Sequence, residues 1–229
     1  MRYALKVLDA RPLVRAGELK PTVILILSAL LVTVHSYFGS MKFALGARPA
    51  AGPLEAALYM FLTAFLLLGA LPALVAAGFG ERLTDYGIQL GDWKTGMRAI
   101  LILFPAIAVL LLYPASQTAE MRAFYPLASQ LLPLELARVI FFYTAWEFFF
   151  RGFMLFGLRE RVGDWLAICI QTVPSCLWHI GCPTGEIVSS IAGGVLFGLL
   201  AIRTKSIVWP WLLHCLIGVG LDFFIVATK

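Results

Sequence analysis

The chain has 229 residues, of which 61% are hydrophobic and only 14% are charged. Soluble globular domains are less apolar and carry about 25% charged residues, so this composition excludes an ordinary soluble domain and favours an all-α bundle of membrane helices. The net charge of +5 fits basic loops held against a membrane face, and no nucleic-acid partner is expected. Because no linker or charge block divides the chain, we predict a single integral membrane domain over residues 1–229.

A helix needs about 20 mostly apolar residues to cross the hydrocarbon core of a bilayer, and seven stretches approach that length. In chain order they are residues 21–38, 54–79, 99–113, 131–158, 165–181, 187–202 and 207–226. Residues 1–20 alternate apolar and basic side chains, which predicts an interfacial amphipathic helix lying on an anionic leaflet. The prediction is therefore about seven spans of the lipid bilayer, preceded by one interfacial helix.

The basic residues predict how the chain is oriented. When the N-terminus is placed in the cytoplasm, 12 Lys and Arg residues fall on the cytoplasmic side and four fall outside. Cytoplasmic loops carry such an excess of basic residues. The short chain and its Ala-, Leu- and Gly-rich spans are typical of bacteria, so we expect a multi-pass protein of the bacterial inner (cytoplasmic) membrane with a cytoplasmic N-terminus.

Two charged residues share one helix face inside the fourth stretch. Glu147 and Arg151 are four residues apart, a spacing at which helical side chains form ion pairs. A charge near the bilayer centre costs at least about 2.5–3.5 kcal/mol on insertion scales and is by default a functional hypothesis. One interpretation is a self-neutralising structural pair. The other is that Glu147 is a general base, because a carboxylate partly removed from water beside a cation suits that role.

Two of the three histidines lie in later stretches, His179 in the fifth and His214 in the seventh. A lone membrane histidine more often makes an interhelical hydrogen bond, and this is the interpretation for His35 in the first stretch. Two histidines together with a Glu–Arg pair favour a functional site instead. Asp222 follows His214 by two helical turns on the same face, and this row predicts the lining of a polar cavity.

In this order the residues resemble the CAAX protease and bacteriocin-processing family of intramembrane peptidases. Members of that family look like EExxxR on one helix, FxxxH on a later helix, and HxxxN or HxxxD on a last one. The resemblance covers residues 133–224. Three positions depart from it: Trp146 stands at the first Glu, Ser175 at the Phe, and Gly218 at the Asn or Asp, with Asp222 one turn later as a substitute.

The resemblance implies hydrolysis of a peptide bond within the membrane, with residues 131–226 as the catalytic core. Glu147, assisted by His179, is expected to orient and deprotonate a water molecule. Arg151 is expected to fix this carboxylate and to keep it ionised. The first Glu of the family pair is the usual catalytic candidate, and Trp146 replaces it here.

The resemblance also implies an oxyanion donor. His214, with Asp222 or a water molecule at Gly218, is expected to donate to the oxyanion of the tetrahedral intermediate. A glutamate-type mechanism without a cofactor is expected. The alternative is a zinc ion held by both histidines and Glu147, since two His and one carboxylate with an open position form a familiar catalytic zinc set.

The expected substrate is a membrane-associated or lipid-anchored protein, in particular a C-terminal sorting-signal peptide, and not a prenylated CAAX protein. Two other classes of function stay open. One is a catalytically inactive relative that lost the Glu at position 146 and acts as a membrane scaffold or immunity protein. The other is a proton-coupled transporter, in which Glu147, Arg151 and the histidines form a relay.

The depth of the site residues conflicts with a shared site. At about 1.5 Å of rise per residue, Glu147 lies about 18 Å from Arg159, whereas His179 lies about 27 Å from Arg161. His179 is therefore predicted closer to the outer face than Glu147. A break in its helix near Pro174, or a helix that begins deeper in the membrane, is expected to resolve this conflict.

Overall fold

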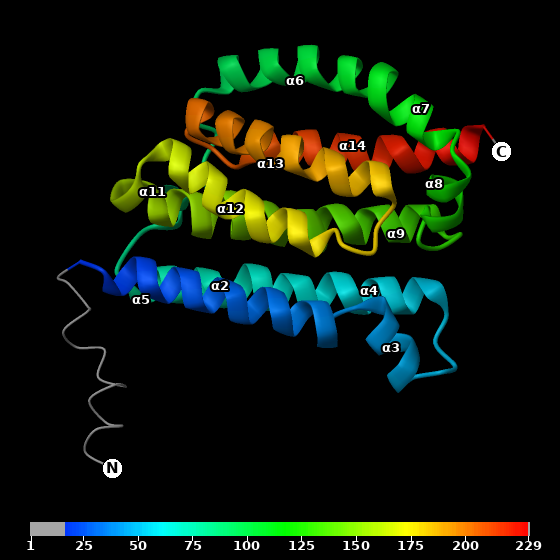
Figure 1. The fold of residues 1–229 in the computed structure, drawn as a ribbon, viewed down its shortest axis with the longest axis horizontal. Helices are drawn as coiled ribbons and strands as arrows, with labels where there is room; N and C mark the ends of the chain where they lie inside the picture. Colours follow the sequence, from blue (N-terminus) through cyan, green and yellow to red (C-terminus); the bar gives the residue numbers. More distant parts are fainter. Residues whose placement is uncertain (1–16, 229) are drawn as a thin grey trace.

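The computed structural model describes residues 17–228, and all the named elements in that part are helices (Figure 1). The predicted all-α helical bundle is confirmed. Six helices are long and apolar enough to cross a membrane. The predicted interfacial helix of residues 1–20 lies, except for its last four residues, outside the described part of the chain.

Three of the six long helices consist of a single regular element. They are α2 (Leu19–Phe38), α13 (Thr184–Thr204) and α14 (Val208–Ala227).

The other three long helices contain π-helical segments, in which backbone hydrogen bonds join residues five apart. One runs through α4 (Pro53–Ala64), η1 (Phe65–Ala70) and α5 (Leu71–Gly78). The next runs through α6 (Trp93–Ile107), η3 (Ala108–Leu112) and α7 (Tyr113–Ser116). The longest runs through α9 (Leu131–Ala137), η4 (Arg138–Tyr143), α10 (Thr144–Glu147), η5 (Phe148–Phe156) and α11 (Gly157–Val162).

Four shorter helices complete the described part. They are α3 (Met41–Ala47), the 3₁₀-helix η2 (Leu83–Tyr86), α8 (Ala119–Phe124) and α12 (Asp164–Trp178). The predicted stretch 165–181 corresponds to α12. This helix has 15 residues and is not one of the six long enough to span by themselves, although it runs beside α13 through the bundle (Figure 1). The predicted seven spans are therefore six long helices and α12.

The helix of residues 131–162 lies at the centre of the bundle. In its most apolar window 78% of the residues are buried within the protein, against 22–33% for the other five long helices. Its consecutive aromatic residues explain this position, because Phe149, Phe150 and Phe153 are fully buried and a helix that is apolar all round packs inside a bundle. The outward apolar faces of the other helices suit contact with lipid. The Glu–Arg pair is thus carried by the most buried helix.

A tight turn at Gly163 sets the relative depth of two site residues. Gly163 has φ +83° and joins α11 to the antiparallel α12. Glu147 and His179 lie equally far from this turn along the chain, so the helical hairpin brings them to the same level. The predicted break at Pro174 is wrong, because α12 continues through this proline. The predicted difference in depth between Glu147 and His179 arose because depth was counted from the basic residues and not from the turn at Gly163.

Candidate active site

Glu147 and Arg151 form the predicted ion pair, and His214 joins it from α14. The Oε1 atom of Glu147 accepts hydrogen bonds from Nη1 of Arg151 at 3.2 Å and from Nδ1 of His214 at 2.6 Å. Glu147 is 0% exposed and Arg151 is 2% exposed. Because an ionised carboxylate only accepts hydrogen bonds, Nδ1 of His214 carries the proton of this contact. The pair therefore orients one imidazole and leaves its Nε2 for another partner.

The geometry of the helix around Glu147 departs from a regular α-helix. The single turn of α10 that carries Glu147 lies between the π-helical segments η4 and η5. Such segments are rare in proteins and are frequent at functional sites. Gly152, within η5, lets another segment approach, since a Cβ atom there would lie 3.1 Å from the backbone oxygen of Tyr86.

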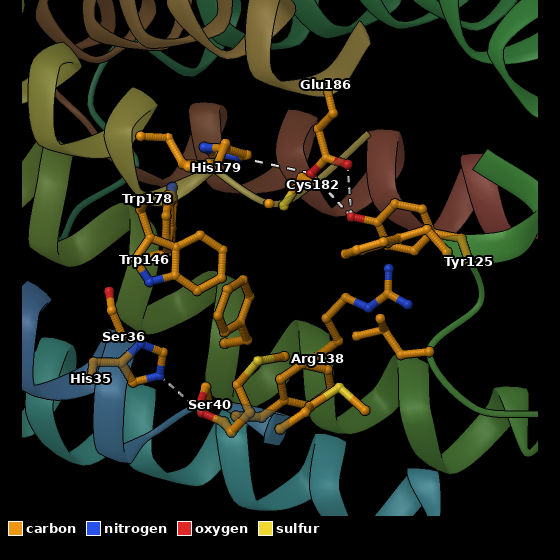
Figure 2. A pocket seen from close by; sticks show the side chains of 18 of the residues that line it. His35, Ser36, Ser40, Tyr125, Arg138, Trp146, Trp178, His179, Cys182 and Glu186 are labelled. Atoms are coloured by element: carbon orange, nitrogen blue, oxygen red, sulfur yellow. Dashed lines mark hydrogen bonds and ion pairs between the residues drawn. The ribbon is translucent and has the colours of Figure 1, made fainter. Parts of the chain in front are cut away.

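A cavity of about 470 Å³ lies next to this pair, and both predicted histidines line it. Figure 2 shows this cavity with His179 in its wall. His179 and His214 line it together with Trp146, Arg138 and aromatic side chains from several helices. Glu147 and Arg151 do not belong to its lining. The structure therefore brings the two imidazoles to one cavity, with the Glu–Arg pair behind His214.

Trp146 fills the position at which the family motif places its first Glu. The indole ring lies 5.6 Å from the ring of His179 and 6.5 Å from the ring of His214, both measured between centroids. It is 2% exposed. The usual place of the catalytic carboxylate is therefore occupied by an apolar side chain between the two imidazoles.

His179 follows the last residue of α12, and its hydrogen bonds define its tautomer. Its Nδ1 lies 2.7 Å from the backbone oxygen of Ser175, and a carbonyl only accepts hydrogen bonds, so Nδ1 carries the proton. In the neutral ring Nε2 then has a free lone pair. This Nε2 lies 3.9 Å from Oε1 of Glu186. The hydrogen bonds and ion pairs of His179 within residues 17–228 do not include Glu147.

Asp222 is buried on α14 but does not support His214. Its carboxylate pairs with Arg138, whose Nη2 also lies 2.7 Å from Oε1 of Glu135. Asp222 is 1% exposed and Arg138 is 4% exposed. The expectation that Asp222 assists His214 is corrected, because a guanidinium from the central helix holds this carboxylate instead.

Tyr143 occupies the space beside Gly218. A Cβ atom built on Gly218 would collide with the hydroxyl oxygen of Tyr143. The Tyr143 ring also lies 4.4 Å from the ring of His214, and Tyr143 lines the cavity. Gly218, at the Asn or Asp position of the family's last motif, is therefore next to a phenol from the central helix.

Residues 128–219 match the family model described as Type II CAAX prenyl endopeptidase Rce1-like. Over these residues the chain is similar to the Rce1-like family. The match supports the resemblance to the CAAX protease and bacteriocin-processing family, and the description of the matched family is that of an endopeptidase. The matched region contains Glu147, Arg151, His179 and His214, whereas Asp222 lies beyond it. No curated protein and no solved structure matches the chain.

Two residues of the Rce1-like region and its flank were not predicted as site residues, Glu186 and Tyr125. The hydroxyl of Tyr125 donates to the Glu186 carboxylate, 3.0 Å from Oε1 and 2.9 Å from Oε2 (Figure 2). Burial, and secondarily the charge of Glu186, raise the pKa of Tyr125 well above its ordinary value, so the phenol stays a donor. Glu186 lies just before the predicted span 187–202, and no local pattern relates it to Tyr125.

The alternative zinc set is not assembled. Among residues 17–228 no three His, Cys, Asp or Glu side chains form a group that could hold a metal ion. Glu147 uses Oε1 for Arg151 and His214 and is absent from the cavity lining, so it does not face the two histidines as a third ligand.

The thiol of Cys182 reports whether water reaches the cavity. Cys182 lines it, and burial, with a smaller contribution from Glu186, raises the pKa of this thiol to about 12. Only the thiolate reacts, so alkylation by iodoacetamide is expected to accelerate about tenfold per pH unit between about pH 7 and 10. Mass spectrometry would measure the rate of Cys182 alkylation in a variant in which Cys169, Cys176 and Cys215 are replaced by alanine. A rate independent of pH would contradict the raised pKa, and no labelling at pH 10 would contradict access by water.

Proposed function

We propose that this chain is an intramembrane endopeptidase that hydrolyses a peptide bond in a membrane-associated or lipid-anchored protein. The observation that carries the proposal is the convergence of His179 and His214 on one cavity, with His214 held by the buried Glu147–Arg151 pair. The family match covers the same residues. Two imidazoles in the lining of one cavity provide a hydrogen-bond acceptor for a water molecule and a donor for the reacting carbonyl.

In this mechanism Glu147 acts through His214. Its carboxylate holds Nδ1 and stabilises the positive charge of the ring after Nε2 has taken up a proton from solvent, before the peptide carbonyl is attacked. Arg151 donates a hydrogen bond to the same carboxylate. The protonated Nε2 then donates to the oxyanion of the tetrahedral intermediate, and the Tyr143 hydroxyl beside the ring is a second donor. His179 offers its Nε2 lone pair to the hydrolytic water.

The size and the aromatic lining of the cavity favour a peptide segment with apolar side chains as the substrate. Its volume of about 470 Å³ lies within the range of ligand-binding pockets, roughly 300–1,000 Å³. Aromatic side chains make up much of its wall, among them Phe142, Trp146 and Trp178. Within the class of membrane-anchored substrates we propose a protein with a C-terminal sorting signal, and the family's description makes a prenylated CAAX peptide the second substrate to test.

The test is cleavage by the purified protein in liposomes. Two probes are used, a reporter with a C-terminal transmembrane anchor and a prenylated CAAX peptide, and products are identified by mass spectrometry. His214→Ala is expected to lower the rate about 10²–10³-fold, the effect of losing one oxyanion donor. Cys215→Ala, the adjacent residue on α14, serves as the control and is expected to cleave like the wild type. Undiminished cleavage by His214→Ala would refute the mechanism.

One observation favours a second candidate, a catalytically inactive membrane scaffold or immunity protein. The indole of Trp146 lies where the family motif has its first carboxylate. In that case the wild-type protein binds both probes without cleaving them, and the His214→Ala variant binds them with the same affinity. This result would replace the first function by the second.

A further inference from the structure

Two hydrogen-bond acceptors lie close together in the lining of the cavity. Oε1 of Glu186 and Nε2 of His179 are 3.9 Å apart, and both residues line the cavity (Figure 2). The proton of the neutral His179 ring is used at Nδ1 by the backbone oxygen of Ser175. Two acceptors do not bond to each other, and a separation beyond 3.5 Å suits a bridging water. A water at this place donates one hydrogen to each acceptor.

The position of Glu186 in the fold leaves its carboxylate oxygens able to accept hydrogen bonds from water. Glu186 lies in the first turn of α13, where the N-terminal end of the helix dipole stabilises negative charge. The single hydroxyl proton of Tyr125 is shared between the two carboxylate oxygens, so lone pairs remain for a water. The side chain is 24% exposed, and it is therefore held in place while its oxygens stay accessible.

The other carboxylates of this region are less suited to contact water in the cavity. Glu147 is 0% exposed, does not line the cavity, and gives Oε1 to two donors. Asp222 and Glu135 are paired with Arg138. Among the described residues, Glu186 is the carboxylate that lines the cavity together with both histidines.

We propose that Glu186 is the general base of this site and supplies, from α13, the carboxylate that Trp146 displaces from the central helix. The inference rests on the proposed peptidase function. Glu186 takes a proton from the water held against His179, while the water oxygen bonds to the carbonyl carbon and the carbonyl π electrons move to its oxygen. On collapse the C–N bond breaks and the leaving nitrogen takes the proton from Glu186. The products are a carboxyl group and an amine.

The test compares Glu186→Gln with a matched variant, Glu120→Gln. Glu120 holds the start of the same helix through the backbone N–H and hydroxyl of Thr184 but does not line the cavity. Glu186→Gln is expected to lower kcat about 10²–10⁴-fold, the contribution of general acid–base catalysis, with KM and thermal unfolding close to wild type. Glu120→Gln is expected to keep wild-type kcat. In Glu186→Ala, added formate is expected to restore part of the lost kcat.

Each other outcome overturns the proposal in a distinguishable way. If Glu186→Gln cleaves like the wild type while His214→Ala is inactive, the peptidase stands and Glu186 is not its base. If Glu186→Gln loses both activity and thermal stability and formate restores nothing to Glu186→Ala, the role of Glu186 is structural. If the wild type cleaves neither the anchored reporter nor the prenylated peptide, the proposed function fails and the base fails with it.

Discussion

Replacing Glu147 by Leu is expected to lower the free energy of unfolding by about 3–5 kcal/mol, the cost of leaving one partner of a buried ion pair without the other. Arg151 is 2% exposed, and its Nη1 donates to the carboxylate that this change removes. The orphaned guanidinium is buried too deeply for bulk solvent to replace that contact. Reversible unfolding in mixed detergent micelles would measure the change. Asp164→Ala, which breaks the exposed pair with Arg159, is the control and should have little effect.

The double variant Glu147→Leu/Arg151→Met distinguishes two roles of Glu147. One is to neutralise the charge of Arg151, and the other is to orient the His214 ring. Replacing both partners of a buried pair by apolar residues is often neutral for stability, so most of the lost stability should return. Cleavage should stay lost, because Nδ1 of His214 has no acceptor to fix its ring. Wild-type stability of Glu147→Leu would contradict the buried pair. Cleavage by the double variant would contradict the role of Glu147 in positioning His214.

Replacing Arg138 by Met is expected to have an effect of similar size, a loss of about 3–5 kcal/mol, because the buried Asp222 and the half-buried Glu135 lose their shared cation. Arg138 donates to Glu135 on its own helix and to Asp222 on α14, so the change also weakens the link between these two helices. The same unfolding measurement applies. Arg48→Met, an exposed position, is the control.

A compensating change tests this explanation. Arg138→Met/Asp222→Asn removes one negative charge together with the positive one and is expected to recover part of the stability. If Arg138→Met unfolds like the wild type, the cluster contributes no net stability. If the double variant is less stable than Arg138→Met, repulsion between the two carboxylates is not the cause.

Local spacing was sufficient for the contacts made within one helix. Glu147 and Arg151 pair as their four-residue separation predicts, because helical geometry alone places such side chains together. The seven apolar stretches likewise predicted the helices, since a bilayer requires every backbone group of a span to be satisfied within the helix. The order of Glu, Arg, His and His was sufficient for the family resemblance.

Contacts between helices were predictable only where the chain itself links them. Asp222 shares a helix face with His214, yet Arg138 from another helix holds its carboxylate. The levels of Glu147 and His179 were mispredicted although the hairpin at Gly163 makes them equal, because basic residues mark the end of a span less accurately than the turn does.

By itself, the sequence determined the class of protein, the helices and their apolar faces, and the local pair that anchors the site. The tertiary structure decided which carboxylate meets which imidazole: His214 with Glu147, and His179 facing Glu186, which Tyr125 holds. The physical reason is that hydropathy and helical periodicity depend on neighbours along the chain, whereas a polar contact across a bundle depends on the rotation and depth at which separate helices pack.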